Sequence, residues 1–557
     1  MAATLYFSYD QIASQLTNDY WISAGQTPHH FSTGDITVNV SALTASGQQL
    51  AQLALKAWSD VANIHFTYTS APALINFDDN QAGAFTAYSY YSGTTRTSSA
   101  SVNIGLDWLQ NYGTSKASYS FQTYIHEIGH ALGLGHAGNY NGDAVFGRDN
   151  HYINDSWQAS VMSYFSQSEN LTTHATAAYD VTPMVADIIA IQQLYGAANA
   201  HIGDDVYAFE DALGIPTAQT LLDPAGYDTL DLSSVTHNQF INLNPETYSN
   251  IGGLIGNIGI GRGTYIEKVI GGSGSDVIVG NRFDNVIEAR SGNDGIDGGP
   301  GNDVAIFGVK SADAATYKFM EGCVVSSQLG NDQLFNIETL RFSDKDVQAD
   351  LHGSRSIYEY GASYKDLAIA FGSDASALMS HFANFGLSEG RGVTFDARLY
   401  LGAYNDLRAA FSKDIASAAK HFIDYGINEG RSSQQFNFAE YIASYKDLIS
   451  AFGVDQQAAT NHYFACGFEE GRGDNFDALQ YIASYGDLIK TFSSDRTAGA
   501  IHYIEYGQIE GRHATFNSHN YVHARGNEDL LAAFGENAHL AENHYIMCGF
   551  YEGRILA

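Results

Sequence analysis

The spacing of apolar residues in the first 200 positions predicts a mixed α/β region. One helical face of LAQLALKAWSDV carries the apolar residues Leu50, Leu53, Ala57 and Val61. Segments 64–69 (IHFTYT) and 101–108 (SVNIGLDW) alternate apolar and polar side chains, as half-buried strands do. These patterns predict an α+β domain over residues 1–200.

From residue 201 to 352 the pattern changes to short apolar pairs separated by Gly, Asn and Asp. Four consecutive nonapeptides, GGSGSDVIV, GNRFDNVIE, ARSGNDGID and GGPGNDVAI, occupy 271–306. They follow the template G-G-x-G-x-D-x-U-x of calcium-binding parallel β structures, in which glycine allows tight turns and aspartate supplies hard oxygen ligands. A flexible Gly/Asp-rich linker is the alternative, but the in-phase residues Ile278, Ile287 and Ile296 argue against it. A calcium-binding RTX-type parallel β-roll is therefore predicted for 201–352.

Two nonapeptides complete one coil of such a roll, so units one and three share a side. Asp276 is therefore expected to stack on Asp294, whereas Asp303 faces Asn285, a weaker ligand. The first side is expected to bind calcium more tightly. The expected ligands in the array are carboxylates and glycine carbonyls, from Gly272, Gly274, Asp276, Gly292, Asp294, Gly301 and Asp303.

A second repeat, in five copies of about 41 residues, fills 353–557 and predicts an all-α domain. Its copies are anchored by HFANFGLSEGR, HFIDYGINEGR, HYFACGFEEGR, HYIEYGQIEGR and HYIMCGFYEGR. A helical stripe precedes each anchor, as in YIASYKDLISAFG, where Gly453 is expected to end the helix and Asp455 to cap the next. A stacked helix pair per repeat is the predicted structure.

The recurring residues of these anchors have two interpretations. The five histidines are His381, His421, His462, His502 and His544. They could bind metal, but a repeated histidine beside an aromatic residue is more often a hydrogen-bonding residue of the core, and we favour that interpretation. Cys466 and Cys548 occupy the position of aromatic residues in the other copies, which predicts small core residues rather than reactive thiols.

The net charge of the chain argues against some classes of binding partner. The chain has 27 Lys and Arg against 61 Asp and Glu, a formal net charge of −34. Such a surface repels nucleic acid phosphates and anionic membranes, and it suits a protein that binds many hard cations. No apolar run is long enough to span a membrane, and the three cysteines cannot form a disulfide framework. The N-terminus lacks the features of a Sec signal peptide, so the protein is expected either to stay in the cell or to leave by another route.

The strongest chemical signal is YIHEIGHALGLGHAGNYNG, residues 124–142. On a helix, His126 and His130 project from the same face one turn apart, so both imidazoles can reach one ion. Glu127 lies beside them, Gly133 falls where the helix must end, and His136 returns as a third imidazole. Three neutral imidazole nitrogens that leave the other coordination positions of the metal ion open are typical of a catalytic zinc site.

The pattern H-E-x-x-H-x-x-G-x-x-H is the metzincin signature, which predicts a methionine-containing turn further along the chain. SVMSYF supplies it and places Met162 below the expected site, with Tyr164 two residues later. A purely structural histidine pair is the alternative interpretation, and the complete pattern makes it the weaker one.

With these motifs, residues 1–350 resemble the serralysins, secreted bacterial metzincin endopeptidases with a calcium-loaded β-roll. YSFQTYIHEIGHALGLGHAGNYNG, NDSWQASVMSYFSQSEN, VTPMVADIIAIQQLYGA and IETLRFSDKDV all look like serralysin segments. The resemblance implies zinc on His126, His130 and His136, with Tyr164 as a displaceable ligand. It also implies type I secretion to the extracellular space and calcium-driven folding there. The helical repeats are not part of the usual serralysin plan.

The resemblance also implies calcium ligands upstream of the nonapeptides. HIGDDVYAF, LLDPAGYDTLD and RGTYIEKV are the segments concerned. The implied ligands are the backbone carbonyls of His201, Gly203, Ala225, Gly226 and Tyr265 and the carboxylates of Asp205, Asp223, Asp228 and Glu267. Where serralysins usually have Arg, Thr and Gly, this chain has His201, Asp205 and Ala225.

These residues predict a zinc metalloendopeptidase that hydrolyses protein substrates. Glu127 is expected to act as general base and Tyr164 to stabilise the oxyanion, with substrate extended along an edge strand of the N-terminal sheet. The alternative is a non-catalytic cell-surface or adhesion protein with an inert protease-like domain. For residues 353–557, recruitment of a substrate or cell surface and capping of the β-roll are both open.

Overall fold

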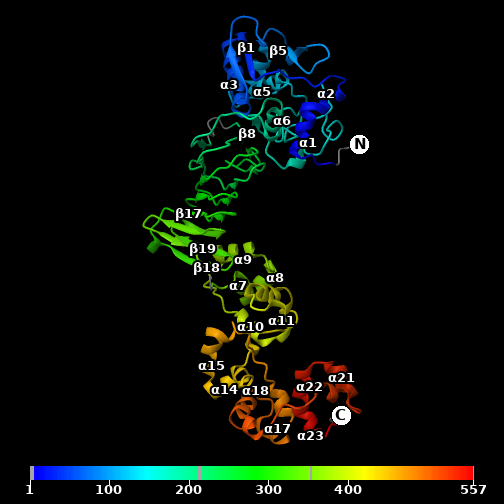
Figure 1. Ribbon diagram of the computed structural model, residues 1–557, viewed down its shortest axis with the longest axis vertical. Coiled ribbons are helices and arrows are strands. Elements are labelled where there is room, and N and C mark those ends of the chain that lie inside the picture. Colours follow the sequence, from blue (N-terminus) through cyan, green and yellow to red (C-terminus); the bar gives the residue numbers. More distant parts are fainter. Residues whose placement is uncertain (1–4, 210–214, 352–353, 556–557) are drawn as a thin grey trace. The chain divides into compact units, whose positions relative to one another are not determined.

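The computed structural model describes residues 5–209, 215–351 and 354–555, and the chain forms two compact units (Figure 1). The first comprises Met1–Lys318 and Gly322–Leu351, and the second comprises Phe319–Glu321 and His352–Ala557. Each unit is described by itself below. Among the described residues, every helix is too short or too polar to cross a bilayer.

The N-terminal part of the first unit is built around a five-stranded sheet in the order β2-β1-β3-β5-β4. Its strands are β1 (Asp35–Ala42), β2 (His65–Tyr68), β3 (Ile75–Asp78), β4 (Ala84–Tyr90) and β5 (Thr97–Ile104). All neighbours are parallel except β4, which pairs antiparallel with β5 and forms an edge of the sheet.

Helices pack on this sheet through one apolar core. The helices and helical turns are α1 (Tyr9–Ser14), η1 (Gln15–Asp19), α2 (Tyr20–Ser23), α3 (Ala45–Val61), α4 (Leu106–Tyr112), α5 (Tyr119–Leu132), η2 (Leu171–Thr173) and α6 (Val185–Tyr195). Leu50, Ala54 and Trp58 of α3 are fully or almost fully buried in the same cluster as Ile125 and Ile128 of α5. The helix and the two strands predicted from periodicity are present, except that Gly105 ends β5 and begins α4, so the end of segment 101–108 is helical.

Short strands follow and form further sheets. They are β6 (Tyr179–Asp180), β7 (Val206–Ala208), β8 (Thr217–Leu221), β9 (Thr229–Asp231), β10 (Phe240–Asn242), β11 (Tyr248–Ser249), β12 (Ile258–Ile260), β13 (Lys268–Ile270), β14 (Val277–Val279), β15 (Val286–Glu288), β16 (Gly295–Asp297), β17 (Val304–Phe307), β18 (Ala315–Phe319), β19 (Gly322–Ser327), β20 (Gly330–Phe335), β21 (Thr339–Phe342) and β22 (Asp346–Gln348), with the turn η3 (Ser311–Asp313) before β18.

Successive nonapeptides alternate between two of these sheets. β10, β14, β16 and β20 pair in parallel in one sheet, and β7, β9, β13, β15, β17 and β21 pair in parallel in the other. In β14, β15 and β16 the middle residue is apolar and buried, and these residues, Ile278, Ile287 and Ile296, lie in one cluster. β19 and β18 extend the first of these sheets beyond β20, and β22 lies beside β21 at an edge of the second. Strands β11, β12, β8 and β6 form a separate four-stranded sheet.

The second unit is helical. Its elements are α7 (Ile357–Ser363), α8 (Lys365–Phe371), α9 (Ala375–His381), η4 (Phe382–Gly386), α10 (Ala397–Ala403), α11 (Asn405–Phe411), α12 (Ile415–His421), η5 (Phe422–Gly426), η6 (Ser433–Gln435), α13 (Phe438–Ala443), α14 (Lys446–Phe452), α15 (Gln456–His462), η7 (Tyr463–Gly467), α16 (Ala478–Ala483), α17 (Gly486–Phe492), α18 (Arg496–His502), η8 (Tyr503–Gly507), α19 (Gln508–Glu510), α20 (Ser518–His523), α21 (Glu528–Phe534), α22 (Ala538–His544), η9 (Tyr545–Gly549) and α23 (Phe550–Glu552).

The predicted helix pair per repeat is wrong in its number of helices. Each repeat has three short α-helices, and a π-helical turn continues the third. In the last two repeats the three-residue helices α19 and α23 follow that turn. The first predicted helix divides because Tyr445 adopts an extended backbone (φ −134°, ψ 121°) between α13 and α14. Its hydroxyl accepts a hydrogen bond from the backbone N–H of Gly473 at 2.9 Å, which ties the division to the next repeat. Gly453 ends α14 and Asp455 caps α15, as predicted.

The repeated histidines of the anchors form hydrogen bonds, as the favoured interpretation predicts. The prediction that Cys466 and Cys548 are core residues is wrong. In every repeat a tyrosine hydroxyl and the histidine Nδ1 lie 2.9–3.1 Å apart, in the pairs Tyr360–His381, Tyr400–His421, Tyr441–His462, Tyr481–His502 and Tyr521–His544. Cys466 is half-buried and Cys548 is exposed. The position is on the surface because it lies on the outer side of the π-helical turn, where Phe385 is 57% exposed.

Candidate metal centre

Helix α5 carries the first part of the candidate site. Ser118 caps its N-terminus by accepting a hydrogen bond from the N–H of Phe121, and Gly133 ends it with φ 111° and ψ 8°. A Cβ at Gly133 would also lie 2.3 Å from the carbonyl oxygen of His29. Both the left-handed backbone and this close approach therefore require glycine at the position. The helix places His126 and His130 one turn apart with Glu127 between them.

The chain after Gly133 brings a third imidazole to the first two. Each ring donates its Nδ1–H to a backbone carbonyl at 2.8 Å: His126 to Val161, His130 to Leu134 and His136 to Tyr140. Because a carbonyl only accepts, each Nδ1 carries the proton and each Nε2 keeps its lone pair.

The three lone pairs converge on one point. The ligand nitrogens of His126, His130 and His136 all lie within 4.8 Å of one another, and the Nε2 atoms of His130 and His136 are 3.0 Å apart. Burial lowers the pKa of His126 to about 4 and of His130 to about 3, so the rings are neutral at physiological pH. Unprotonated nitrogens this close repel one another unless a cation lies between them, and three imidazoles are a donor set that suits zinc. The residues therefore fit the ion.

The methionine turn lies beneath α5. Met162 is fully buried, and a Cβ at Gly129 would lie 2.7 Å from its sulfur. Glycine at this position allows the sulfur to pack directly against the helix between the two histidines. The packing positions α5 against the turn and involves no polar atom of the site.

Asp187 of α6 holds this turn in place. Its Oδ1 accepts a hydrogen bond from the Ser160 hydroxyl at 2.6 Å, and its Oδ2 accepts from the N–H of Val161 at 2.8 Å. Since Val161 receives the Nδ1–H of His126, the carboxylate orients a ligand ring through one residue. Sequence reasoning missed Asp187, although a buried aspartate in the apolar run VADIIAI was a usable signal.

Asp155 acts in the same way on the third imidazole. Its Oδ1 accepts from the hydroxyls of Ser163 at 2.7 Å and Tyr140 at 3.1 Å, and Tyr140 provides the carbonyl bonded to His136. Asp155 is fully buried, and burial raises its pKa to about 7. This residue was also missed from sequence.

Glu127 is buried beside the imidazoles and faces the edge strand. The Thr86 hydroxyl, from β4, lies 2.8 Å from its Oε2. Burial raises the pKa of Glu127 to about 7, and the Thr86 hydrogen bond acts in the opposite direction. A carboxyl group with a pKa near neutrality can both accept and return a proton. Thr86 was not singled out from sequence because it lies 41 residues from Glu127.

Tyr164 lies against the imidazoles on the side of the methionine turn. Its ring centroid is 4.5 Å from that of His136 and 6.1 Å from that of His126. Burial raises the pKa of its hydroxyl, and the backbone of Gly142 acts in the opposite direction. The hydroxyl is thus a neutral donor next to the candidate metal centre.

The upstream residues implied as calcium ligands lie on the three segments that precede β7, β9 and β13. His201 Nδ1 lies 2.9 Å from Asp205 Oδ2, and these two form a cluster with Asp223. The N–H of Asp205 donates to Asp228 and the N–H of Asp228 donates to Glu267. A Cβ at Gly226 would lie 2.3 Å from the carbonyl of Gly203, which shows how closely these loops approach. The ring of Tyr265 packs on Phe283, and the expectation that its backbone carbonyl is a ligand stays a prediction.

The nonapeptide aspartates form two ladders, and the expected stacking is confirmed. The N–H of Asp276 donates to Oδ1 of Asp294, and that of Asn285 donates to Oδ1 of Asp303, both at 2.7 Å. The glycines line the same turns: a Cβ at Gly292 would meet the Gly274 carbonyl at 2.2 Å, one at Gly301 the Phe283 carbonyl at 2.8 Å and one at Gly272 the Val235 carbonyl at 2.3 Å.

Each ladder continues beyond the nonapeptides. The N–H of Asp294 donates to Asp332, and that of Asp303 donates to Glu338. One buried carboxylate oxygen has no hydrogen-bond partner on each of Asp228, Asp294 and Asp303. Such oxygens are available to a hard cation. Sequence reasoning missed Asp332, which lies within β20, and Glu338, which directly precedes β21, because both fall outside the nine-residue period.

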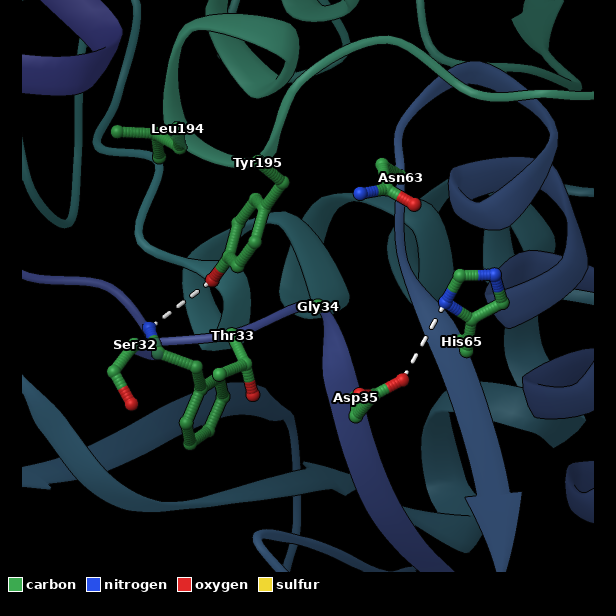
Figure 2. Close-up of a pocket in the computed structure, with 9 residues that line it drawn as sticks. Ser32, Thr33, Gly34, Asp35, Asn63, His65, Leu194 and Tyr195 are labelled. Carbon is green, nitrogen blue, oxygen red and sulfur yellow. Dashed lines mark hydrogen bonds and ion pairs between the residues drawn. The ribbon is translucent and has the colours of Figure 1, made fainter.

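A separate cavity of about 390 Å³ lies elsewhere in the N-terminal region (Figure 2). It is lined by Phe31, Ser32, Thr33, Gly34, Asp35, Asn63, His65, Leu194 and Tyr195. In Figure 2 the Tyr195 hydroxyl accepts the Phe31 N–H, and His65 faces Asp35 across an exposed 3.5 Å ion pair. None of the candidate metal ligands lines this cavity.

Two family models match the chain. Residues 33–196 match the model described as Matrixin, and residues 189–380 match the model described as Peptidase M10 serralysin C terminal. The second match extends across α7, α8 and most of α9.

Curated relatives cover the same part of the chain. Metallopeptidase AprA of Pseudomonas marginalis is 39% identical over 273 residues, which is 44% of this chain and 56% of that protein. Serralysin C of Dickeya chrysanthemi is 36% identical over 311 residues, 49% of this chain and 64% of that protein. Serralysin of Photorhabdus luminescens is 36% identical over 269 residues, 44% and 55% respectively. The chain thus spans between about half and two thirds of these relatives.

Proposed function

Across residues 33–380 this chain belongs to the serralysin-type M10 peptidases, and on that basis we propose that it is a secreted, zinc-dependent endopeptidase. The observation that carries the proposal is the convergence of three neutral imidazole nitrogens beside a buried carboxyl group. The proposed ligands are His126, His130 and His136. The close approach of the three imidazoles favours this proposal over the alternative of a non-catalytic adhesion protein with an inert protease-like domain.

The proposed hydrolysis of a peptide bond gives a role to each of the other groups at the centre. Zinc, when bound, supplies Lewis acidity that polarises the scissile carbonyl and acidifies the attacking water. Glu127 accepts a proton from that water and donates it to the leaving amine, which its pKa of about 7 permits in both directions. Tyr164 donates a hydrogen bond to the developing oxyanion, and as the family suggests it is also a displaceable zinc ligand. Asp187 and Asp155 position the imidazoles.

Substrate binds in an extended conformation along β4. This strand is an edge of the sheet, and its Thr86 contacts Glu127, so a peptide paired with β4 passes directly over the candidate metal centre. Backbone pairing recognises any extended segment, which suits an endopeptidase acting on unfolded or loop regions of proteins.

Residues 201–352 bind calcium as an RTX-type β-roll and fold with it. Support comes from the parallel coils and from the unpartnered oxygens of Asp228, Asp294 and Asp303. In the absence of cations, stacked carboxylates repel one another, so calcium stabilises the coils. Folding that requires calcium is consistent with type I export to the extracellular space. We propose residues 1–200 as the catalytic domain and 353–557 as a module for substrate or surface contact.

The test compares Glu127→Gln with the wild-type chain on casein. The variant is expected to keep its zinc and to lose at least about 1,000-fold in kcat, because it lacks the general base while its ligands are intact. Glu169→Gln, which changes an exposed loop carboxylate nearby, is the control and should retain activity. A zinc-loaded Glu127→Gln protein with wild-type activity would reject the assignment, and a wild-type protein that stays inactive with zinc bound would support the adhesion alternative.

A further inference from the structure

Three side chains in the last helical repeat lie within metal-binding distance of one another. The His519 Nδ1 is 2.9 Å from one oxygen of Glu536, and the His523 Nε2 is 2.8 Å from the other. The two imidazole rings have centroids 4.2 Å apart, and one ligand atom from each residue lies within 4.8 Å of the others. This cluster is separate from the candidate catalytic centre, since it belongs to the other compact unit.

The local structure explains this arrangement. Asn517 caps α20 by accepting the N–H of Asn520, and His519 and His523 are four residues apart on the same face of that helix. Glu536 occupies the tight turn between α21 and α22, directly after Gly535 (φ 57°) and before the cap residue Asn537. All three side chains are accessible, with exposed fractions of 64% for His519, 39% for His523 and 63% for Glu536.

The other four repeats lack all three ligands. When the helix caps are aligned, His519 corresponds to Tyr358, Arg398, Ala439 and Leu479. His523 corresponds to Ala362, Gly402, Ala443 and Ala483. Glu536 corresponds to Ser373, Lys413, Val454 and Ser494. The repeat fold therefore does not need these residues, and they occur together in one copy.

We propose that His519, His523 and Glu536 form a second site for a divalent transition metal ion. Two imidazoles and one carboxylate are a borderline donor set that suits zinc, nickel or copper better than calcium, which takes oxygen ligands alone. The ion replaces the protons that now lie between the imidazoles and Glu536. Because three protein ligands leave coordination positions open to solvent, water or a donor group of another molecule completes the site.

A neighbouring cluster shows what distinguishes this one. His462, Cys466 and Glu470 also lie close together, but His462 Nδ1 is engaged with the Tyr441 hydroxyl and Glu470 pairs with Arg472 at 2.5 Å. In the cluster of α20, each imidazole instead directs a nitrogen at the Glu536 carboxylate, whose ion pairs within the described part of the chain are with these two histidines and not with a lysine or arginine.

The experiment uses the full-length chain with its catalytic zinc in place and calcium in excess. Equilibrium dialysis against micromolar zinc measures metal per chain, and added copper gives an electron paramagnetic resonance spectrum that reports imidazole nitrogens. The wild-type chain is expected to take up one zinc equivalent more than His523→Ala and to show copper bound by two imidazoles. His519→Ala should lose the same equivalent. Casein hydrolysis should be unchanged, because the cluster lies in the other unit.

Two controls keep the result interpretable. Alanine at position 523 is the residue that three sister repeats carry there, so His523→Ala is compatible with the fold. His513→Ala removes an exposed histidine six positions before His519 and should leave metal uptake unchanged. If His523→Ala retains the extra equivalent, or if the wild-type chain takes up none, the three residues are a hydrogen-bonded surface cluster and the proposal is overturned.

Discussion

The Asp187 Oδ2 accepts the backbone N–H of Val161 at 2.8 Å, and the carbonyl of the same Val161 accepts the Nδ1–H of His126 at 2.8 Å. A carboxylate on α6 therefore fixes the tautomer and direction of His126, a proposed ligand on α5, through a single residue of the methionine turn. The candidate centre depends on three chain segments that are far apart in sequence, 126–136, 155–164 and 185–195.

Asp187→Asn should weaken zinc binding. An amide can accept at only one atom, whereas Asp187 uses both oxygens for Ser160 and Val161, so the turn and the His126 ring lose their fixed position. The expected loss is about 10- to 100-fold in zinc affinity, measured by competition with a chromogenic chelator. Asp60→Asn, at an exposed i,i+4 ion pair, is the control. Unaltered affinity in a folded Asp187→Asn protein would contradict this role.

Thr86→Val should move the acid limb of the pH–rate profile to higher pH. The Thr86 hydroxyl hydrogen bonds to the Glu127 carboxylate and lowers its pKa, so its removal favours the protonated, inactive base. At about pH 6 we expect a loss of about 10-fold in kcat/KM, which corresponds to about 1.4 kcal/mol. The loss should shrink at alkaline pH. A uniform loss at all pH values would instead indicate impaired substrate pairing on β4.

Tyr164→Phe should reduce kcat much more than it changes KM. The hydroxyl is proposed to stabilise the oxyanion and not to bind the ground-state substrate, so its removal costs about 100-fold in kcat with KM within about 3-fold. Tyr112→Phe, at an exposed tyrosine of α4, serves as the control. Equal effects on kcat and KM would assign Tyr164 to substrate binding.

Without calcium, stability should fall as the pH rises. Burial and the neighbouring Asp332 and Asp276 raise the pKa of Asp294 to about 8. A carboxyl group with a higher pKa in the folded chain stabilises the fold below its unfolded pKa, near 4, and this stabilisation is lost as the pH rises to the folded value. In EGTA we therefore expect a thermal midpoint lower by about 2–4 °C at pH 8 than at pH 5.5, and calcium should remove the difference.

Asp294→Asn tests the origin of that pH dependence. The variant cannot titrate at this position, so its midpoint in EGTA should depend less on pH and should rise less when calcium is added. Asp297→Asn, on the same strand β16, is the matched variant and should behave as wild type. Identical pH and calcium responses in Asp294→Asn and the wild-type chain would exclude Asp294 as a ligand.

Tyr481→Phe should destabilise its repeat without changing metal content. The Tyr481 hydroxyl and His502 Nδ1 are 3.0 Å apart, and loss of one such hydrogen bond costs about 1 kcal/mol. Tyr506→Phe alters a 55% exposed tyrosine of the same repeat and should have no effect. A drop in bound metal in Tyr481→Phe would revive the metal interpretation of the recurring histidines.

The parts predicted well from sequence are those whose determinants are local. His126, Glu127 and His130 lie within one helical turn and a half, and the nonapeptide period places Asp276 beneath Asp294 without reference to the rest of the chain. Thr86, Asp155 and Asp187 were not predicted because their partners lie far along the chain, and hydrogen bonds of this kind leave no periodic trace in one sequence.

The helical repeats show a different limit. Periodicity gave the helical stripe that ends at Gly453, but it could not reveal the extended conformation of Tyr445, which divides that stripe into α13 and α14. The stabilising contact is with Gly473, 28 residues later in the chain. The exposed position of Cys548 was missed for a similar reason, since aromatic residues at the same place in sister repeats suggested burial.

The ladders of β14, β16 and β20 make neighbouring coils mutually dependent. The carboxylate of each aspartate accepts the backbone N–H of the aspartate in the preceding coil. Asp294 therefore accepts from Asp276, and its own N–H donates to Asp332. A substitution that removes one of these aspartates therefore also removes a hydrogen bond from a neighbouring coil. Its destabilising effect extends along the stack and is not limited to a single turn. In a surface loop of equal length, the same substitution would destabilise that loop alone.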